Sequence, residues 1–153
     1  MRTCQNRKLR QRSAIRARGG NTAALQIVLD TNVLVSGLLS PHGAPAKILN
    51  LVINSNVILV LDARIFDEYS DVLHRKKFSF PDDAVNEILS FIRRESVFIS
   101  PCPVTCTIPD PGDLPFIEVS LHATVPVVTG NVRHFNGSGA SVMTPVQFLD
   151  EMT

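Results

Sequence analysis

Residues 25–34 read LQIVLDTNVL, in which a mostly apolar run leads to the aspartate at position 30. Residues 26–29 do not alternate between apolar and polar side chains, which predicts a short strand buried on both faces. Asp30 follows at once, and a buried carboxylate needs polar partners. We expect Thr31 and Asn32 to supply only a local turn. The stretch therefore predicts a buried strand that delivers an acid to the edge of a sheet.

Further strands and helices alternate along the rest of the chain. β-branched runs predict strands, and apolar residues at helical spacing predict helices, with Asp62 and Thr144 as N-caps and Pro145 at a first helical position. The expected strands are 57–62, 97–100, 125–131 and a short one within 140–145, and the expected helices are 32–39, 44–53, 62–74, one starting at 81–83, 113–123 and one from 145. This order indicates a three-layer α/β/α domain with a mostly parallel central sheet of four to five strands.

Charge divides the chain into two parts. Seven of the 15 basic residues lie in residues 1–20 with no acid, which leaves eight basic against 14 acidic residues, a net charge of −6 for the remainder. We expect residues 1–24 to form a basic flexible tail and residues 25–153 to form the domain. The tail is either an electrostatic arm that attracts nucleic acid, a segment with no role, or the product of a start codon placed too far upstream.

Composition excludes several classes of protein. No apolar run approaches the roughly 20 residues that span a bilayer, and no apolar core of a secretory signal follows the basic residues. Three sparse cysteines do not suggest a disulfide scaffold, and Cys102 and Cys106 lack a second ligand pair for zinc. We therefore expect a cytoplasmic protein with no membrane association.

Three acids are placed where a parallel sheet puts its working site, outside the carboxyl ends of the strands. Asp30 ends the first strand, Glu68 lies in the helix after the second, and Asp113 opens the helix after a proline-rich loop, although Asp113 could also be a simple helix cap. Thr129 and Asn131 follow a later strand. Clustered carboxylates repel one another, and Mg²⁺ or Mn²⁺ relieves this repulsion. Such ions also stabilise charge on a reacting phosphodiester.

The motifs resemble those of a known family, the PIN domains. The first block is IVLDTNVLVSGLLSPHGAPAKIL (27–49), the second is LDARIFDEYSDVLHRKKF (61–78) and the third is IPDPGDLPFIEVSLHATVPVVTGN (108–131). The resemblance covers about residues 25–150. The run from Asp110 to Glu118 is similar to that of the PIN-family toxins of toxin–antitoxin systems.

The resemblance implies a PIN-like fold and a Mg²⁺- or Mn²⁺-dependent nuclease that hydrolyses RNA to leave 5′-phosphate and 3′-hydroxyl ends. Carried over by position, Asp30, Glu68 and Asp113 would hold the metal. Thr129 would orient a ligand or water, and Asn131 would complete the catalytic set. An antitoxin protein is the implied partner, and homodimers are common among such relatives.

The chain departs from the family pattern at its fourth acid. Asn131 stands where many members have Asp, and His134 occupies another position that is often acidic. An amide oxygen can ligate but brings no charge, so we expect one tightly held ion and a weaker second. Asp110 and Glu118 are possible substitutes for the missing acid. Asp110 could instead make a turn with Pro111 and Gly112, and Glu118 is expected to point away from Asp113 on a regular helix.

Two other classes of function are compatible with parts of the pattern. A phosphatase of the haloacid-dehalogenase type requires an acid two residues after the nucleophilic Asp, and here that residue is Asn32. A catalytically weak or inactive domain that binds RNA or a partner is compatible with the missing fourth acid. The retained Asp30, Glu68 and Asp113 favour an active nuclease.

Overall fold

Five parallel strands form the central sheet of the computed structural model, which describes residues 24–152. Their order across the sheet is β3-β2-β1-β4-β5. The strands are β1 (Leu25–Leu29), β2 (Val57–Leu61), β3 (Val97–Phe98), β4 (Val127–Val128) and β5 (Val142–Met143). This confirms the prediction of a central parallel sheet. The predicted tail lies almost entirely outside the described residues, so the domain boundary remains a prediction.

Burial on both faces explains why the two long strands carry almost no polar residues. Ile27, Val28 and Leu29 are completely buried in β1, and Leu25 pairs with Val57 in the parallel register that joins β1 to β2. On its other side β1 pairs with β4, Val28 lying opposite Val127. A strand with neighbours on both edges and helices on both faces has no polar surroundings. β1 is therefore the centre of the core.

The helices begin and end close to where the sequence predicts. They are α2 (Thr31–Leu39), α3 (Ala44–Ile53), α4 (Ala63–Leu73), α5 (Asp82–Glu95), α6 (Leu114–Ala123) and α7 (Pro145–Met152), with 3-10 turns η1 (Lys76–Phe78), η2 (Pro111–Asp113) and η3 (Val132–Phe135). Asp62 accepts a hydrogen bond from the Ile65 N–H at the start of α4. Thr144 and Gln147 exchange side-chain to backbone hydrogen bonds at the start of α7, a reciprocal capping arrangement.

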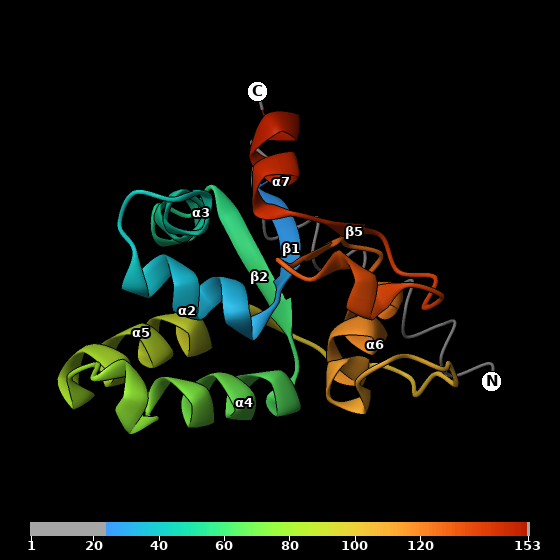
Figure 1. Cartoon of the computed structure of the whole chain (residues 1–153), viewed down its shortest axis with the longest axis horizontal. Coiled ribbons are helices and arrows are strands. Elements are labelled where there is room, and N and C mark those ends of the chain that lie inside the picture. The colour runs from blue at the N-terminus through green and yellow to red at the C-terminus, as the bar shows by residue number, and fades with distance from the viewer. Residues whose placement is uncertain (1–23, 153) are drawn as a thin grey trace.

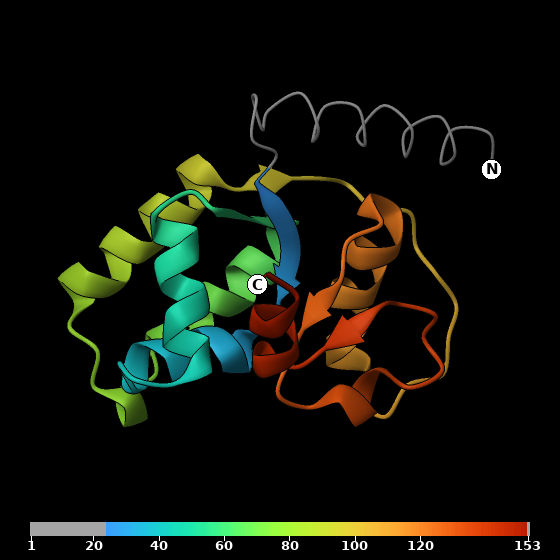
Figure 2. The same ribbon diagram turned by 90° about the horizontal axis from the view of Figure 1, so that it is seen from above.

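The helices cover the sheet in two layers. Figure 2 shows α3 and α5 on one side of β1 and α6 on the other, and Figure 1 shows α2 and α4 below the carboxyl end of β1. None of the described helices is long and apolar enough to cross a membrane.

Strand order creates a single switch point in the sheet. The chain proceeds from β1 to β2 and β3 on one side and then returns to place β4 and β5 on the other. Connections leave β1 and β4 in opposite directions, which opens a crevice outside their carboxyl ends. Asp30 and Thr129, the residues that follow these two strands, lie at this crevice.

Candidate active site

Asp30 and Thr129 are in direct contact at the switch point. The Thr129 hydroxyl donates to Asp30 Oδ2 at 2.6 Å, and the backbone N–H of Asn131 donates to Thr129 Oγ1 at 3.0 Å. Asp30 is 6% exposed and Thr129 is fully buried. The hydroxyl thus fixes one oxygen of a buried carboxylate.

Glu68 is held by a second threonine. The Thr31 hydroxyl donates to Glu68 Oε2, which joins the first turn of α2 to the middle of α4. The expectation that Thr31 supplies only a local turn is therefore wrong. Its side chain makes a contact across 37 positions of sequence, because packing of α2 against α4 brings the two side chains together.

Asp113 belongs to the turn η2, directly before α6. Its carboxylate makes no capping hydrogen bond at the start of α6, so the interpretation as a simple cap is wrong. Oδ2 is buried and has no hydrogen-bond partner among the described residues. The nearest charged contact of this oxygen is His134 Nδ1 at 3.6 Å, which is too long for a hydrogen bond. An unsatisfied buried carboxylate oxygen is costly unless a cation or proton joins it.

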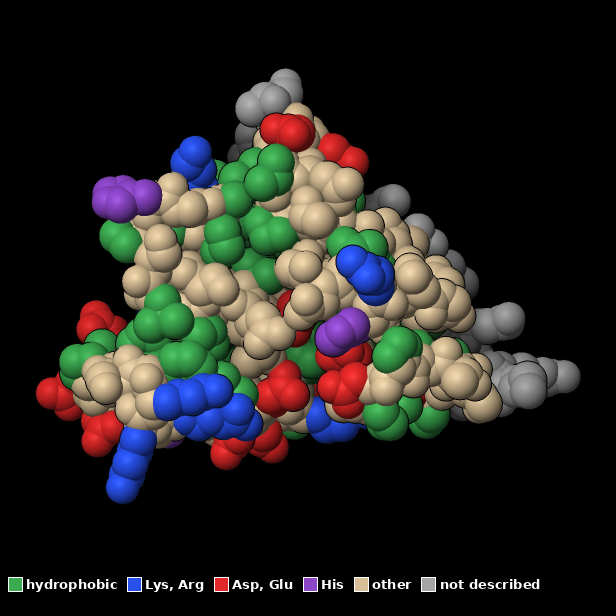
Figure 3. All heavy atoms as spheres, viewed as in Figure 1, with side chains coloured by type: hydrophobic (Ala, Val, Ile, Leu, Met, Phe, Trp, Pro, Cys, Tyr) green, Lys and Arg blue, Asp and Glu red, His purple; other side chains and the backbone are tan. Residues whose placement is uncertain are grey.

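Electrostatic interactions link the three acids. Burial and the negative charges of Asp30, Asp110 and Glu68 together raise the pKa of Asp113 to about 6, against the opposing effect of His134. Burial also raises the pKa of Asp30, against the opposing effects of the Thr129 hydroxyl and the backbone N–H groups that follow Asp30. In Figure 3 acidic side chains gather near the middle of the visible face, with a histidine against them.

The donor set fits a hard divalent cation. Three carboxylates, one of them with an unpaired buried oxygen, match the ligand preference of Mg²⁺ and Mn²⁺. No three acidic, histidine or cysteine side chains of residues 24–152 are already gathered at metal-ligand spacing. Glu68 and Asp113 would therefore have to turn toward Asp30 to share an ion.

The remaining predicted residues differ in their placement. Asn131 is exposed and contacts the site through its backbone N–H. Asp110 Oδ1 accepts from the Gly112 N–H at 2.9 Å, the predicted turn. Glu118 is buried, and its two oxygens accept from Arg64 and from the Val104 N–H, each at 2.8 Å. Glu118 is thus a structural acid that points away from the pocket, as expected.

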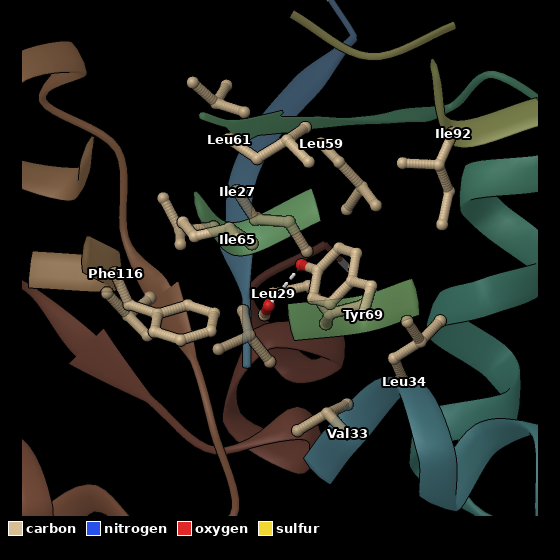
Figure 4. Packing of buried hydrophobic residues seen from close by; sticks show 14 of the residues in the cluster. Ile27, Leu29, Val33, Leu34, Leu59, Leu61, Ile65, Tyr69, Ile92 and Phe116 are labelled. Atoms are coloured by element: carbon tan, nitrogen blue, oxygen red, sulfur yellow. Dashed lines mark hydrogen bonds between the residues drawn. The ribbon is translucent and has the colours of Figure 1, made fainter. Parts of the chain in front are cut away.

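Two residues that support the site were not found from the sequence. The Tyr69 phenol is fully buried and donates to the Leu29 carbonyl at 2.5 Å, the contact drawn in Figure 4. This hydrogen bond links the residue after Glu68 to the residue before Asp30. Arg64 bridges Asp62 and Glu118, at 2.7 and 2.8 Å, and so connects α4 to α6. Adjacency to Glu68 was the one available signal for Tyr69, and Arg64 had none.

The fold and the site together define an α/β domain with an acidic pocket at the switch point of a parallel sheet. A family model described as PIN domain matches residues 26–133, which is well over half of the chain. The chain belongs to the PIN-domain family, a family of nucleases. It is 27% identical over 141 residues to Uncharacterized protein MJ1680 of Methanocaldococcus jannaschii, covering 83% of this chain and 91% of the relative.

Solved structures share the fold at low sequence identity. A chain of FitAB bound to an IR36 DNA fragment superposes with a TM-score of 0.55 at 17% identity, over 78% of this chain and 94% of the other. VapBC2 from Rickettsia felis, bound to a DNA fragment from its promoter, gives 0.54 at 14% identity, over 78% and 98%. FitAcB from Neisseria gonorrhoeae gives a TM-score of 0.53 at 20% identity, over 78% of this chain and 98% of the other. These similarities confirm the predicted PIN-like fold.

Proposed function

We propose that this protein is a metal-dependent endoribonuclease that hydrolyses RNA phosphodiesters. One observation carries the proposal: Asp30 and Glu68 act electrostatically on Asp113, and a buried oxygen of Asp113 lacks a hydrogen-bond partner among the described residues. Asp30, Glu68 and Asp113 would hold Mg²⁺ or Mn²⁺. When bound, such an ion supplies positive charge for the phosphodiester and lowers the pKa of water.

The residues of the chain itself orient and pre-organise the pocket. Thr129 donates its hydroxyl proton to Asp30, and the Asn131 N–H donates to Thr129, so a two-step hydrogen-bonded chain fixes the first carboxylate. The Thr31 hydroxyl fixes Glu68 in the same way. Carboxylates that are held in advance lose little conformational entropy when they bind a ligand.

RNA must approach a domain whose net charge is negative. Several candidate basic residues are already engaged: Arg75 pairs with Asp71, Arg94 pairs with Glu95, and Arg93 lies 4.5 Å from the centre of the Phe66 ring. Lys76 and Arg133 are exposed and form no ion pair with a described residue. We propose that these two contact the phosphate backbone, which predicts salt-sensitive binding.

A cleavage assay on structured RNA tests the proposal. Native protein should cut in Mg²⁺ or Mn²⁺, EDTA should stop the reaction, and Asp30→Asn should be inactive. Glu87→Gln, a change at an exposed acid of α5, is the matched control and should cut normally. Cleavage that survives both EDTA and Asp30→Asn would refute the nuclease proposal.

A second candidate function is RNA or partner binding with little catalysis. Asn131 favours it, because an exposed amide stands where many family members have an acid. Unchanged RNA through the assay, together with salt-sensitive RNA binding by native protein, would support this candidate.

We further propose that the protein is the toxin of a toxin–antitoxin pair. The sequence resemblance supports this role, as does structural similarity to chains of FitAB and VapBC2. Induced native protein should arrest growth and Asp30→Asn should not. Co-expression of the product of a neighbouring gene should restore growth through a complex that co-purifies. Equal growth with native protein and Asp30→Asn would contradict the toxin role.

A further inference from the structure

His134 lies against the acidic pocket without a hydrogen-bonding role in it. It belongs to η3, between β4 and β5, and its side chain is 49% exposed. Its Nδ1 atom faces Asp113 Oδ2 at 3.6 Å. That oxygen is the buried one with no hydrogen-bond partner in the described part of the chain. Two facing polar atoms that do not bond each other leave room for a common partner.

The imidazole also acts electrostatically on the first carboxylate. Its charge lowers the pKa of Asp30 as well as that of Asp113, so the ring lies near both acids. Two donors that each bind one ion at about 2.1–2.2 Å lie roughly 3–4 Å apart. The separation between Nδ1 and Oδ2 falls in that range.

We propose that His134 is a direct ligand of the divalent cation and replaces the missing fourth acid with a nitrogen donor. The inference rests on the proposed metal-dependent function. It assigns to η3 the role that Asn131 does not fill, since the Asn131 side chain is exposed and neutral. A nitrogen donor also changes metal preference, because Mg²⁺ is held by oxygen ligands and imidazole suits transition metals. The site should therefore favour Mn²⁺ and Co²⁺ over Mg²⁺.

A counter-charge role for His134 gives the opposite result. A protonated imidazole beside Asp113 would compensate the acid in the metal-free protein and would compete with an incoming cation. Removing it would then strengthen metal binding or leave it unchanged. Removing a ligand would weaken binding, and more for Mn²⁺ than for Mg²⁺. The two roles therefore predict opposite changes in Mn²⁺ affinity when His134 is removed.

The experiment combines Mn²⁺ electron paramagnetic resonance with calorimetric titration of Mn²⁺ and Mg²⁺, on full-length protein without a histidine tag. Native protein should show a ¹⁴N coupling to bound Mn²⁺. His134→Ala should lose this coupling and bind Mn²⁺ about tenfold or more weakly, with a smaller loss for Mg²⁺. His134→Asp should also lose the coupling and should bind Mg²⁺ at least as tightly as native protein.

His42→Ala is the matched control because it removes an exposed imidazole that lies between α2 and α3. It should keep the coupling and bind both ions as tightly as native protein. Circular dichroism and thermal melting confirm that each variant is folded. Absence of a ¹⁴N coupling in native protein, or equal or tighter Mn²⁺ binding by His134→Ala, would overturn the inference. Failure of native protein to bind either ion would instead refute the proposed metal-dependent function.

Discussion

Arg64→Met tests how the two outer carboxylates are held in position. Arg64 is the second residue of α4, the helix that also carries Glu68, and its partner Glu118 lies on α6, the helix that Asp113 precedes. Its guanidinium contacts Asp62 at 2.7 Å and Glu118 at 2.8 Å. Methionine keeps most of the apolar stem and removes both ion pairs. The bridge between α4 and α6 is then lost.

Burial sets the size of the expected effect. The Asp62 and Glu118 side chains are 7% and 4% exposed, whereas Arg64 is 49% exposed. Breaking a buried ion pair costs about 3–5 kcal/mol, because a charge is left without a partner. Water reaches the exposed half of Arg64 and screens the pair, so we expect about 2–3 kcal/mol. For a domain of this size that corresponds to a fall in Tm of roughly 4–12 °C.

Urea unfolding at pH 7 measures this loss. Arg75→Met is the matched control, since Arg75 pairs with Asp71 on the exposed side of the same helix, and such a pair contributes less than about 0.5 kcal/mol. Adding Glu118→Gln to Arg64→Met removes the unpaired charge and keeps an acceptor for the Val104 N–H, so it should recover about 1 kcal/mol or more. A loss at Arg64 no larger than at Arg75 would refute the bridging role.

Three further changes test the site itself. Thr129→Val keeps the side-chain shape but removes the donor to Asp30, so Mn²⁺ affinity measured by calorimetry should fall about tenfold; unchanged affinity would contradict the orienting role. Tyr69→Phe leaves the buried Leu29 carbonyl without its hydrogen bond and should lower the free energy of unfolding in urea by about 1–2 kcal/mol. Ser90→Ala, at an exposed position of α5, is the control and should change stability little. Folding raises the pKa of Asp113 from 3.8 to about 6, so the protonated form favours the folded state and the ionised form opposes it. Metal-free Asp113→Asn should therefore match native stability near pH 4 and exceed it by about 1–2 kcal/mol at pH 7, since solvent screens part of the interaction, and an equal difference at both pH values would exclude this linkage.

The layered fold could be predicted because its signals are local. Apolar runs identify strands, and Asp62 and Thr144 begin helices through contacts within three residues. Strands β3 and β4 were predicted too long. A strand that ends in a turn was expected over 125–131, but only Val127 and Val128 form β4, where Pro126 lacks an N–H for a longer ladder. Strand length depends on the neighbouring strand, and a local pattern does not contain that information.

Site contacts depend on distances between elements, so most of them could not be predicted. Strand ends place Asp30 and Thr129 at one edge of the sheet, and the rule for parallel sheets predicts their approach. The Thr31 contact with Glu68 depends on how α2 packs against α4, and the Arg64 contact with Glu118 spans 54 positions. Neither contact leaves a periodic or spacing signal in the chain.

Replacement of the fourth acid changes the electrostatic balance of the whole pocket. With Asn131 neutral, three carboxylates share the site, and two of them are already stabilised by threonine hydroxyls. Fewer like charges mean less repulsion in the metal-free protein and less repulsion of an RNA phosphate, but also weaker attraction for a cation. Asp113 has the least compensated negative charge of the three acids, because its buried oxygen has no hydrogen-bond donor in the described structure. Loss of metal should therefore affect Asp113 and η3 first, while Asp30 stays fixed by Thr129.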